Sequence, residues 1–447
     1  MVGNAEDRLT RRTIAAIATP PGRGGVGVVR ISGPNALAVA IALSGRDRLT
    51  PRHCHLVTFR DSEGQALDQG LVIYFPAPGS FTGEDVVELQ GHGGRAVMRG
   101  LLDAAQSAGA VSAEPGEFTR RAFLNNRMDL SQAEAVAGLI EAETLTAARA
   151  SLRSLEGELG REVEGLAEEL TRVRVFLEGA LDFPDEDMDL LEEQRISTQV
   201  VGLLERVQSV RERAASGVRL SEGFLVVIAG RPNAGKSSLL NRLAGRDSAI
   251  VTERAGTTRD ILRETIALGG FPVELADTAG LRETEDPVER EGVRRAREEL
   301  NRADLALFLV DSVVGWTDED AGEWDRLPPE RREVVWAKGD VGTPPSGATA
   351  ISTVAPPGLG QLEKLLEERL QMESTGDALG ARQRHVEILD RVGADLDNAR
   401  NTLEAYGSGD LAAQDLRRAH EALGEITGRI HSDDLLGRIF ATFCIGK

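Results

Sequence analysis

The chain has 447 residues, long enough for about two to four domains that each bury a core. Apolar residues make up 41% and charged residues 28%, as in ordinary globular proteins, and no apolar run is long enough for a membrane span or a signal peptide. The formal net charge of −20 excludes a generally basic surface, so an RNA partner would need a local basic patch or a second protein.

The first 124 residues predict an α+β domain. Short β-branched runs indicate strands at 26–32, 71–77 and 85–91, and apolar periodicity indicates helices at 35–45 and 94–109. Gly22 to Gly27 also fit the spacing G-x-G-x-x-G, with Asp47 further along. A dinucleotide-binding loop must open a helix, whereas a strand-like run follows here. We therefore interpret these glycines as a turn that a ligand can approach closely.

The rest of the chain alternates between an all-helical pattern and a mixed strand–helix pattern. Residues 125–220 are rich in Ala, Leu and Glu with helical periodicity, residues 221–378 alternate strand and helix, and residues 379–447 are helical again. This order predicts an α/β domain inserted into an all-helical one. The acidic run 182–193 lacks the glycine-turn spacing of a calcium loop, so we expect a solvated connection between two helices.

The most specific motif is a phosphate-binding loop. An apolar strand, 224–229, leads into Gly230-x-x-x-x-Gly235-Lys236-Ser237 and then into a helical pattern. In such a loop the backbone N–H groups converge on phosphate oxygens. Lys236 would neutralise the β- and γ-phosphates, and the Ser237 hydroxyl would ligate Mg²⁺.

Two further motifs indicate a switch GTPase. Asp277 ends an apolar strand, where a carboxylate can hold Mg²⁺ through water, and the Gly280 N–H can meet the γ-phosphate. The polar loop 252–260 contains Thr257 and Thr258, and a threonine that ligates Mg²⁺ only beside a γ-phosphate makes an order–disorder switch.

The base-recognition segment departs from the usual Asn-Lys-x-Asp. It reads Ala337-Lys338-Gly339-Asp340, so Asp340 can accept from guanine and Lys338 can lie over the base, but the amide is missing. We expect nucleotide binding to be weaker by roughly 1–2 kcal/mol. We do not expect the preferred nucleotide to change from GTP to ATP. The later Ser352-Thr353-Val354 resembles the loop that contacts the edge of the base.

The water-orienting group is not evident from the motifs alone. Leu281 follows Asp-Thr-Ala-Gly where Ras-like enzymes have a glutamine, so another group must position water and another cation must offset the developing charge. Asn233 in the phosphate-binding loop could hold a monovalent cation. Glu289 lies in a nearby acidic stretch, and viewed alone it is typical of a surface helix.

The C-terminal sequence "FCIGK" permits three readings. Cys444 occupies the position of a prenylated cysteine, but Gly446 and Lys447 fit that signal poorly. A frayed terminus is the ordinary default. The preceding residues are apolar, which favours a docked helix that carries Cys444 to a specific place. With only Cys54 besides, no disulfide framework is possible, and a reducing, cytoplasmic compartment is expected.

Taken together, these segments resemble the MnmE (TrmE) family of tRNA modification GTPases over essentially the whole chain. The resemblance is carried by "ATPPGRGGVGVVRISG", "SFTGEDVVELQGHGG", "EPGEFTRRAFLNNRMDLSQAEA", "GRPNAGKSSLLN", "AGTTRD", "DTAGLRETEDPVEREG" and "CIGK". It implies a multidomain α/β plus all-α protein. Its expected parts are an α+β folate-binding and dimerisation domain (1–124), a helical domain from two segments (125–220 and 379–447) and an inserted Ras-like P-loop GTPase domain (221–378).

The resemblance also implies roles for individual residues. Catalytic roles fall on Glu289, which would orient water, and on Cys444 as a candidate nucleophile. Mg²⁺ ligation falls on Ser237 and Thr258, and K⁺ ligation falls on Asn233, Thr252, the Arg254 carbonyl and Thr257. Folate contacts fall on Arg30, Glu88, Arg127 and Lys447. The expected GTP-binding set is Asn233, Ala234, Gly235, Lys236, Ser237, Ser238, Thr252, Glu253, Arg254, Ala255, Gly256, Thr257, Thr258, Asp277, Thr278, Ala279, Gly280, Lys338, Asp340, Ser352, Thr353 and Val354.

The implied activity is a potassium-activated GTPase, active as a homodimer. With an FAD-dependent partner of the MnmG type, in a heterotetramer, it would convert C5 of the wobble uridine (position 34) of tRNA to a carboxymethylaminomethyl or aminomethyl form. The implied cofactors are GTP, Mg²⁺, K⁺ and 5-formyl- or methylene-tetrahydrofolate as the one-carbon carrier. The main alternative is a switch GTPase in ribosome or RNA assembly, although such proteins usually carry a basic RNA-binding module, which the charge of −20 disfavours.

Overall fold

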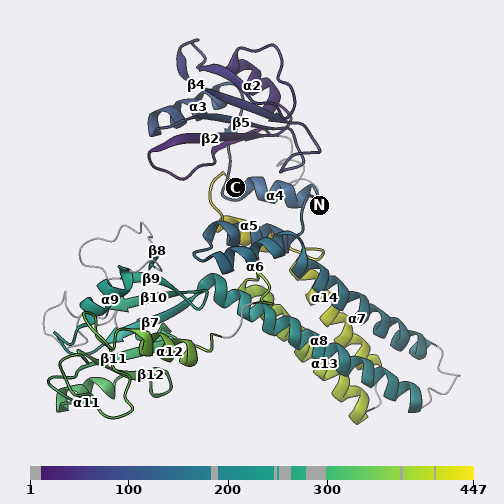
Figure 1. Cartoon of the computed structure of the whole chain (residues 1–447). Coiled ribbons are helices and arrows are strands. Elements are labelled where there is room, and N and C mark those ends of the chain that lie inside the picture. The colour runs from purple at the N-terminus through teal and green to yellow at the C-terminus, as the bar shows by residue number, and fades with distance from the viewer. Residues whose placement is uncertain are drawn as a thin grey trace, which may run out of the picture. The chain divides into compact units, whose positions relative to one another are not determined.

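The computed structural model describes residues 12–182, 190–245, 249–250, 263–277, 299–372, 376–406 and 409–446 (Figure 1). The chain forms two compact units, each assembled from separate stretches of sequence. Unit 1 comprises Met1–Ala137, Gly160–Leu204 and Arg391–Lys447, and unit 2 comprises Gly138–Leu159 and Glu205–Asp390. No helix in the described ranges is long and apolar enough to cross a membrane.

Unit 1 contains a six-stranded sheet in the order β3-β4-β5-β2-β1-β6. Its pairs are antiparallel except for β1 with β6. The strands are β1 (Ile14–Ile17), β2 (Gly24–Ser32), β3 (His55–Arg60), β4 (Ala66–Phe75), β5 (Val86–Gly93) and β6 (Val111–Ser112). Strand β2 starts in the glycine run, so the prediction that these glycines do not open a helix is confirmed.

Two helices cover one face of this sheet, α2 (Ala36–Ser44) and α3 (Arg95–Ser107) (Figure 1). Alternate strand residues such as Val29, Ile31 and Leu89 pack with the apolar sides of these helices in one buried cluster. The intervening residues therefore point to the opposite face, where Arg30 of β2 lies in register with Glu88 of β5. The α+β class expected for this part of the chain is confirmed.

The helices of unit 1 come from both ends of the chain. They are α4 (Glu117–Leu124), most of α5 (Leu130–Glu141) and α7 (Glu158–Asp182), the first part of α8 (Leu190–Glu222), the second part of α13 (Gln383–Tyr406), α14 (Gly409–Thr427) and α15 (Asp433–Ala441). Buried Leu436, Phe440 and Phe443 pack against Leu130 and Ala133 of α5. The C-terminal segment is thus docked, and residues 183–189 of the acidic run lie outside the described residues.

Unit 2 holds a second six-stranded sheet, in the order β12-β11-β7-β10-β9-β8. Strands β12, β11, β7 and β10 are parallel, and β9 and β8 continue antiparallel. The strands are β7 (Phe224–Ala229), β8 (Ala249–Ile250), β9 (Arg263–Leu268), β10 (Phe271–Asp277), β11 (Leu305–Asp311) and β12 (Arg332–Ala337). A parallel sheet buries both faces, which explains its near-continuous apolar strands, such as "LALFLV" in β11.

Helices lie on both faces of the second sheet. Leu239 and Leu243 of α9 (Lys236–Ala244) and Leu362 of α12 (Gly360–Arg369) pack on one side. On the other, Phe308 meets Trp324 of α11 (Asp318–Trp324), and a 3₁₀ turn (Pro329–Arg331) leads into β12. The expected P-loop GTPase sheet is therefore present.

The chain returns from the second sheet across α6 and α8. Leu379 N donates to Arg213 O (3.1 Å), and the guanidinium of Arg153, in α6 (Leu145–Leu155), donates to Ala378 O (2.5 Å). A β-carbon on Gly217 of α8 would lie 1.5 Å from Leu379 O, so only glycine permits this crossing. Ala147, Ala150 and Leu220 therefore join the same core cluster as the sheet.

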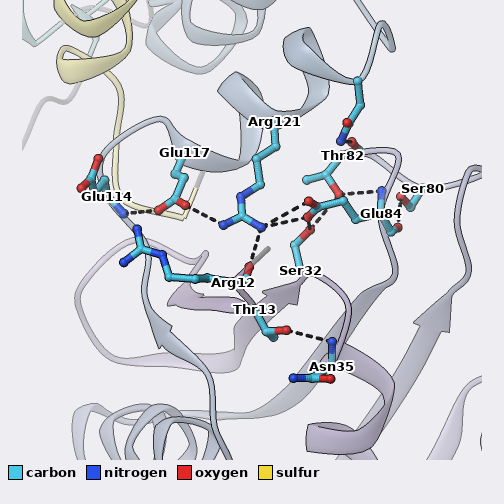
Figure 2. Close-up of polar contacts among 11 residues, drawn as sticks. Arg12, Thr13, Ser32, Asn35, Ser80, Thr82, Glu84, Glu114, Glu117 and Arg121 are labelled. Atoms are coloured by element: carbon cyan, nitrogen blue, oxygen red, sulfur yellow. Dashed lines mark hydrogen bonds and ion pairs between the residues drawn. The ribbon is translucent and has the colours of Figure 1, made fainter. Parts of the chain in front are cut away.

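A buried arginine ties α4 to the sheet of unit 1. The Arg121 guanidinium, 1% exposed, contacts Glu117 (Nη2 to Oε1, 2.7 Å) and Glu84 (Nη1 to Oε2, 3.0 Å), and Nη1 also donates to Arg12 O at 2.8 Å. Figure 2 shows Ser32 and Thr82 completing the network around Glu84, with the Ser32 hydroxyl donating to Glu84 Oε2 at 2.7 Å. One side chain thereby joins α4, the 80–85 loop and the segment just before β1.

Replacement of Arg121 by methionine should destabilise unit 1 by about 3–5 kcal/mol, because the buried carboxylate of Glu117 and the partly buried one of Glu84 would lose their counter-ion. Arg99→Met is the matched control, since Arg99 forms an exposed i,i+4 pair with Asp103 and should cost about 1 kcal/mol or less. All three tryptophans lie in unit 2. Hydrogen exchange of β2 and β5 in urea is therefore the suitable measurement, and equal losses for both variants would contradict the prediction.

Candidate functional site

The phosphate-binding loop connects β7 to α9. Gly230, Asn233 and Gly235 have φ values of +131°, +65° and +107°, in the region that favours glycine and tolerates asparagine. A β-carbon on Gly230 would lie 2.4 Å from Leu309 O of β11, so the loop is pressed against the neighbouring strand. Helix α9 begins at Lys236, and its N-terminus faces the loop, as an anion site requires.

The acid of this site is buried and the lysine is half-buried. Lys236 Nζ donates to Gly230 O (2.6 Å) and Arg231 O (3.0 Å), and burial lowers the pKa of its ammonium while Asp277 opposes that effect. Burial raises the pKa of the Asp277 carboxyl, while Lys236 and the Ser237 hydroxyl oppose that effect. Asp277 comes from β10, which pairs with β7 so that Asp277 lies opposite Ile228.

The oxygens around Asp277 fit a magnesium ion. Asp277 Oδ1 is buried and has no hydrogen-bond partner within the described residues. An orphaned buried carboxylate oxygen beside the Ser237 hydroxyl is the oxygen donor set that Mg²⁺ uses in nucleotide sites. No cluster of three or more His, Cys, Asp or Glu side chains suited to a metal occurs in the described ranges. A magnesium ion here would depend on few protein ligands and on nucleotide oxygens.

Residues 337–340, the segment expected to recognise the base, lie at the same edge of the sheet. Asp311 and Ala337 end parallel neighbours β11 and β12 in register. Gly339 N donates to Ile351 O (2.9 Å), which brings the segment 337–340 beside Ser352. The Ser352 hydroxyl accepts from Val354 N and Ala355 N (3.2 Å each), which shapes this loop. Val354 itself is 83% exposed.

Several expected site residues cannot be placed. They lie outside the described residues: Thr252, Glu253, Arg254, Ala255, Gly256, Thr257, Thr258, Thr278, Ala279, Gly280, Glu289 and Lys447. Asn233 to Ser238 follow β7, Asp277 ends β10, and Lys338 and Asp340 follow β12. Ser352 to Val354 follow Ala350, which forms a bridge to Trp336 of β12. Of the expected K⁺ ligands only Asn233 is placed.

The residue that anchors the phosphate-binding loop, Asp320, was not predicted from the sequence. Arg231 Nε contacts Asp320 Oδ1 at 2.9 Å, and Asp320 is 1% exposed at its side chain. Asp320 also accepts from Thr317 N (2.9 Å) and the Thr317 hydroxyl (2.8 Å) in a capping box that starts α11. The Thr-x-x-Asp spacing before a helix was a readable signal for that cap. That spacing does not indicate that Arg231 would pair with Asp320.

A second polar site lies on the open face of the sheet in unit 1. Arg30 donates to Glu88 Oε1 through Nε (3.2 Å) and Nη2 (3.0 Å), and its guanidinium lies 5.5 Å from the Phe81 ring and 5.9 Å from the Phe118 ring. Both bonds fall on Oε1, so Oε2 can accept from a ligand. A half-buried ion pair flanked by aromatic rings suits a planar ligand with N–H donors and a negative tail, as in a folate.

Arg127 adjoins the loop that carries Phe81. A β-carbon on Gly83 would lie 3.2 Å from Arg127 Cγ, and Gly83 has a φ of +79°. The aliphatic stem of Arg127 therefore packs beside the glycine of "SFTGE", while Arg127 N donates to Ala122 O at 2.8 Å. Arg30, Glu88 and Arg127 come from three separate stretches of sequence within unit 1.

The C-terminal tail ends beside β1. Gly446 has a φ of +97°, and a β-carbon there would lie 2.5 Å from Ile17 O. Gly116 N donates to Cys444 O at 3.4 Å, and Cys444 is exposed. Since Ala16 of β1 lies opposite Arg30 of β2, the tail meets β1 next to the row that contains Arg30. The sequence predicted that the final helix docks, and the structure confirms it.

The strand–loop–helix with its half-buried lysine, and the acid at the end of β10 beside it, define a P-loop GTPase. A family model described as the MnmE helical domain matches residues 130–444, and one described as the GTP-binding protein TrmE N-terminus matches residues 13–127. The chain belongs to the MnmE (TrmE) family, and it is a GTP hydrolase.

Curated relatives match along nearly their full length. The "tRNA modification GTPase MnmE" of Pseudomonas paraeruginosa (strain DSM 24068 / PA7) is 48% identical, covering 97% of this chain and 99% of the relative. The protein of the same name from Marinobacter nauticus (strain ATCC 700491 / DSM 11845 / VT8) is 47% identical, with 97% and 99% covered. The solved structure of a point variant of Aquifex aeolicus Era bound to GDP.AlF4- has 20% identity and a TM-score of 0.28, covering 46% of this chain and 89% of that one.

Asp277→Asn should stabilise the nucleotide-free protein at pH 7.5 while abolishing Mg²⁺-dependent GTP hydrolysis. The pKa of Asp277 is raised in the folded state, so its ionised form costs stability above that pKa and the cost disappears as pH falls through it. The gain in unfolding temperature, followed by tryptophan fluorescence, should therefore shrink on acidification. Asp311→Asn is the control of opposite sign, because the pKa of Asp311 is lowered. A gain independent of pH would contradict this reasoning.

Proposed function

We propose that this chain is a potassium-activated GTPase that, with an FAD-dependent partner of the MnmG type, modifies C5 of the wobble uridine of tRNA. The product would be carboxymethylaminomethyl- or aminomethyl-uridine, with a tetrahydrofolate as one-carbon carrier. The observation that carries the proposal is in unit 1. There the tail with Cys444 docks against Ile17 of β1, the strand that pairs with the Arg30-bearing β2, on a chain that also has a complete strand–loop–helix for nucleotide phosphates. The relatives' shared name supports the tRNA substrate.

Each residue would contribute a binding or positioning step. Arg30, Arg127 and Lys447 would supply cationic contacts to a folate, and Glu88 would accept from its N–H groups. When bound, the folate would supply a one-carbon unit. Cys444, exposed at the docked tail, would be the nucleophile candidate.

In the nucleotide site, Lys236 would offset phosphate charge and Ser237 with Thr258 would hold Mg²⁺. Asn233, Thr252, the Arg254 carbonyl and Thr257 would hold K⁺, and Glu289 would orient water. Asp340 and Lys338 would select guanine, with the backbone of Ser352, Thr353 and Val354 at the base edge. The remaining GTP-binding positions named from the sequence would contribute backbone contacts.

The proposed working form is a cytoplasmic homodimer that joins two copies of the FAD protein in a heterotetramer. Mass spectrometry of wobble uridines from cells lacking this protein tests the whole proposal. Loss of the C5 substituent that returns with the wild-type gene is expected. Unchanged wobble uridines would favour a switch GTPase in RNA assembly instead.

GTP hydrolysis should be faster in KCl than in NaCl at equal ionic strength, because a cation held by Asn233 would offset charge developing on the phosphates. Asn233→Ala should remove the difference between the salts. Equal rates for the wild-type protein in both salts would defeat the cation argument.

Ala337→Asn should tighten GDP and GTP binding by about tenfold, since an amide restores a hydrogen bond worth roughly 1–2 kcal/mol. The Ala337 methyl is 5% exposed and lies beside the phosphate-binding loop, where such an amide would be held. Calorimetric titration with GDP measures the change, and an unaltered affinity would show that the missing amide is irrelevant.

Gly446→Ala should prevent docking of the tail and lower tRNA modification by about a hundredfold while sparing GTP hydrolysis, because the added methyl would clash with Ile17 O. Gly437→Ala is the matched control, since a β-carbon on Gly437 meets nothing within 4 Å. Modification assays with purified partner and tRNA distinguish the two. Full activity of Gly446→Ala would mean that the docked tail is not part of the modification site.

A further inference from the structure

The turn after β12 places a lysine in an unfavourable backbone conformation. Lys338 has a φ of +57°, in the left-handed region that non-glycine residues seldom adopt. Its carbonyl accepts from Val341 N (3.1 Å) and Gly342 N (2.9 Å), which closes the turn. These bonds shape the turn but do not fix the lysine side chain.

Position 337 cannot hold this turn against the phosphate-binding loop. The Ala337 methyl is buried, and a β-carbon placed on Gly235 would lie 3.7 Å from it. The two loops therefore approach each other through a methyl group and a glycine, and neither of these residues carries a polar side chain that could join them. A polar contact that holds the turn after β12 must therefore come from another residue.

Asp311 supplies a tie from the neighbouring strand. Its Oδ2 lies 2.6 Å from Lys338 Nζ, and its Oδ1 accepts from Val313 N at 2.9 Å. The carboxylate is 13% exposed and the lysine side chain is 42% exposed, so the pair is anchored on the Asp311 side. Burial would raise the pKa of Asp311, but Lys338 and the amides of Val313 and Val314 hold it below its ordinary value, so the charge is permanent at neutral pH.

The Asp311–Lys338 ion pair differs in kind from the other contacts of residues 337–340. Of residues 337–340, Lys338 is the one whose side chain makes a polar contact within the described ranges. The other polar contacts of the segment are backbone bonds, such as Ser312 N to Ala337 O at 3.0 Å. At this edge of the sheet, therefore, position 337 has no polar side chain, and Lys338 is instead held by an ion pair with Asp311.

We propose that Asp311 is a positioning residue for guanine-nucleotide binding. It holds Lys338 and the turn after β12 in place, a role that an asparagine amide at position 337 would otherwise perform. The inference rests on the proposed function of residues 337–340 in base recognition. It predicts that the contribution of Asp311 depends on what occupies position 337, which a purely structural ion pair would not do.

A double-mutant cycle on the full-length protein tests this coupling. GDP affinity is measured by calorimetry for the wild type, Asp311→Asn, Ala337→Asn and the double variant. Asp311→Asn should raise the Kd about fivefold in the natural background, the upper range for a partly exposed pair, and less than about twofold in the Ala337→Asn background. In steady-state hydrolysis it should raise KM and leave kcat unchanged, because the base contact is uniform through the reaction.

The matched control is Asp304→Asn, which removes the same charge at the opposite end of β11. Asp304 Oδ2 accepts from Leu225 N at 2.9 Å, far from the carboxyl edge of the strand, and its loss should leave the Kd unchanged. An equal effect of Asp311→Asn in both backgrounds, or none in either, would overturn the inference alone. A wild-type protein that binds no GDP would overturn the nucleotide assignment together with it.

Discussion

The nucleotide site depends on one constraint, the parallel alignment of four strands in unit 2. Parallel neighbours end at the same edge of a sheet, so the phosphate-binding loop after β7, Asp277 at the end of β10 and the turn after β12 are delivered together. These three segments are far apart in the sequence. The register of the strands, in which Asp311 lies opposite Ala337, also sets which side chains can compensate for one another across that edge.

Unit 1 places its charged residues differently. The Arg30–Glu88 pair lies on one face of a mostly antiparallel sheet, and not at the shared edge of parallel strands. The Arg121 network connects α4 to the 80–85 loop, and that loop carries Phe81 to the side of Arg30. A buried carboxylate that is fully hydrogen-bonded fixes geometry even where it adds little net stability. The network therefore holds in place the loop that carries Phe81 beside Arg30.

Strong local signals were readable from the sequence, and long-range pairings were not. The phosphate-binding loop, the α+β texture and the docked final helix follow from spacing and periodicity. The partnership of Arg231 with Asp320 and that of Lys338 with Asp311 do not, because they join residues 89 and 27 positions apart through tertiary packing. The short strands β1, β3 and β6 were also missed, since four residues of "IAAI" are too few to show a period.

The crossing at Gly217 bears on how this protein can be dissected. Because Ala147, Ala150 and Leu220 belong to the core cluster of the second sheet, a fragment cut at 221 and 378 would leave one side of that core facing water. Ala378 would also lose its bond to Arg153, and the fragment would lack the anchoring bond between Leu379 and Arg213. Truncated versions that keep α6 and the C-terminal half of α8 should remain monodisperse at concentrations where the shorter fragment aggregates.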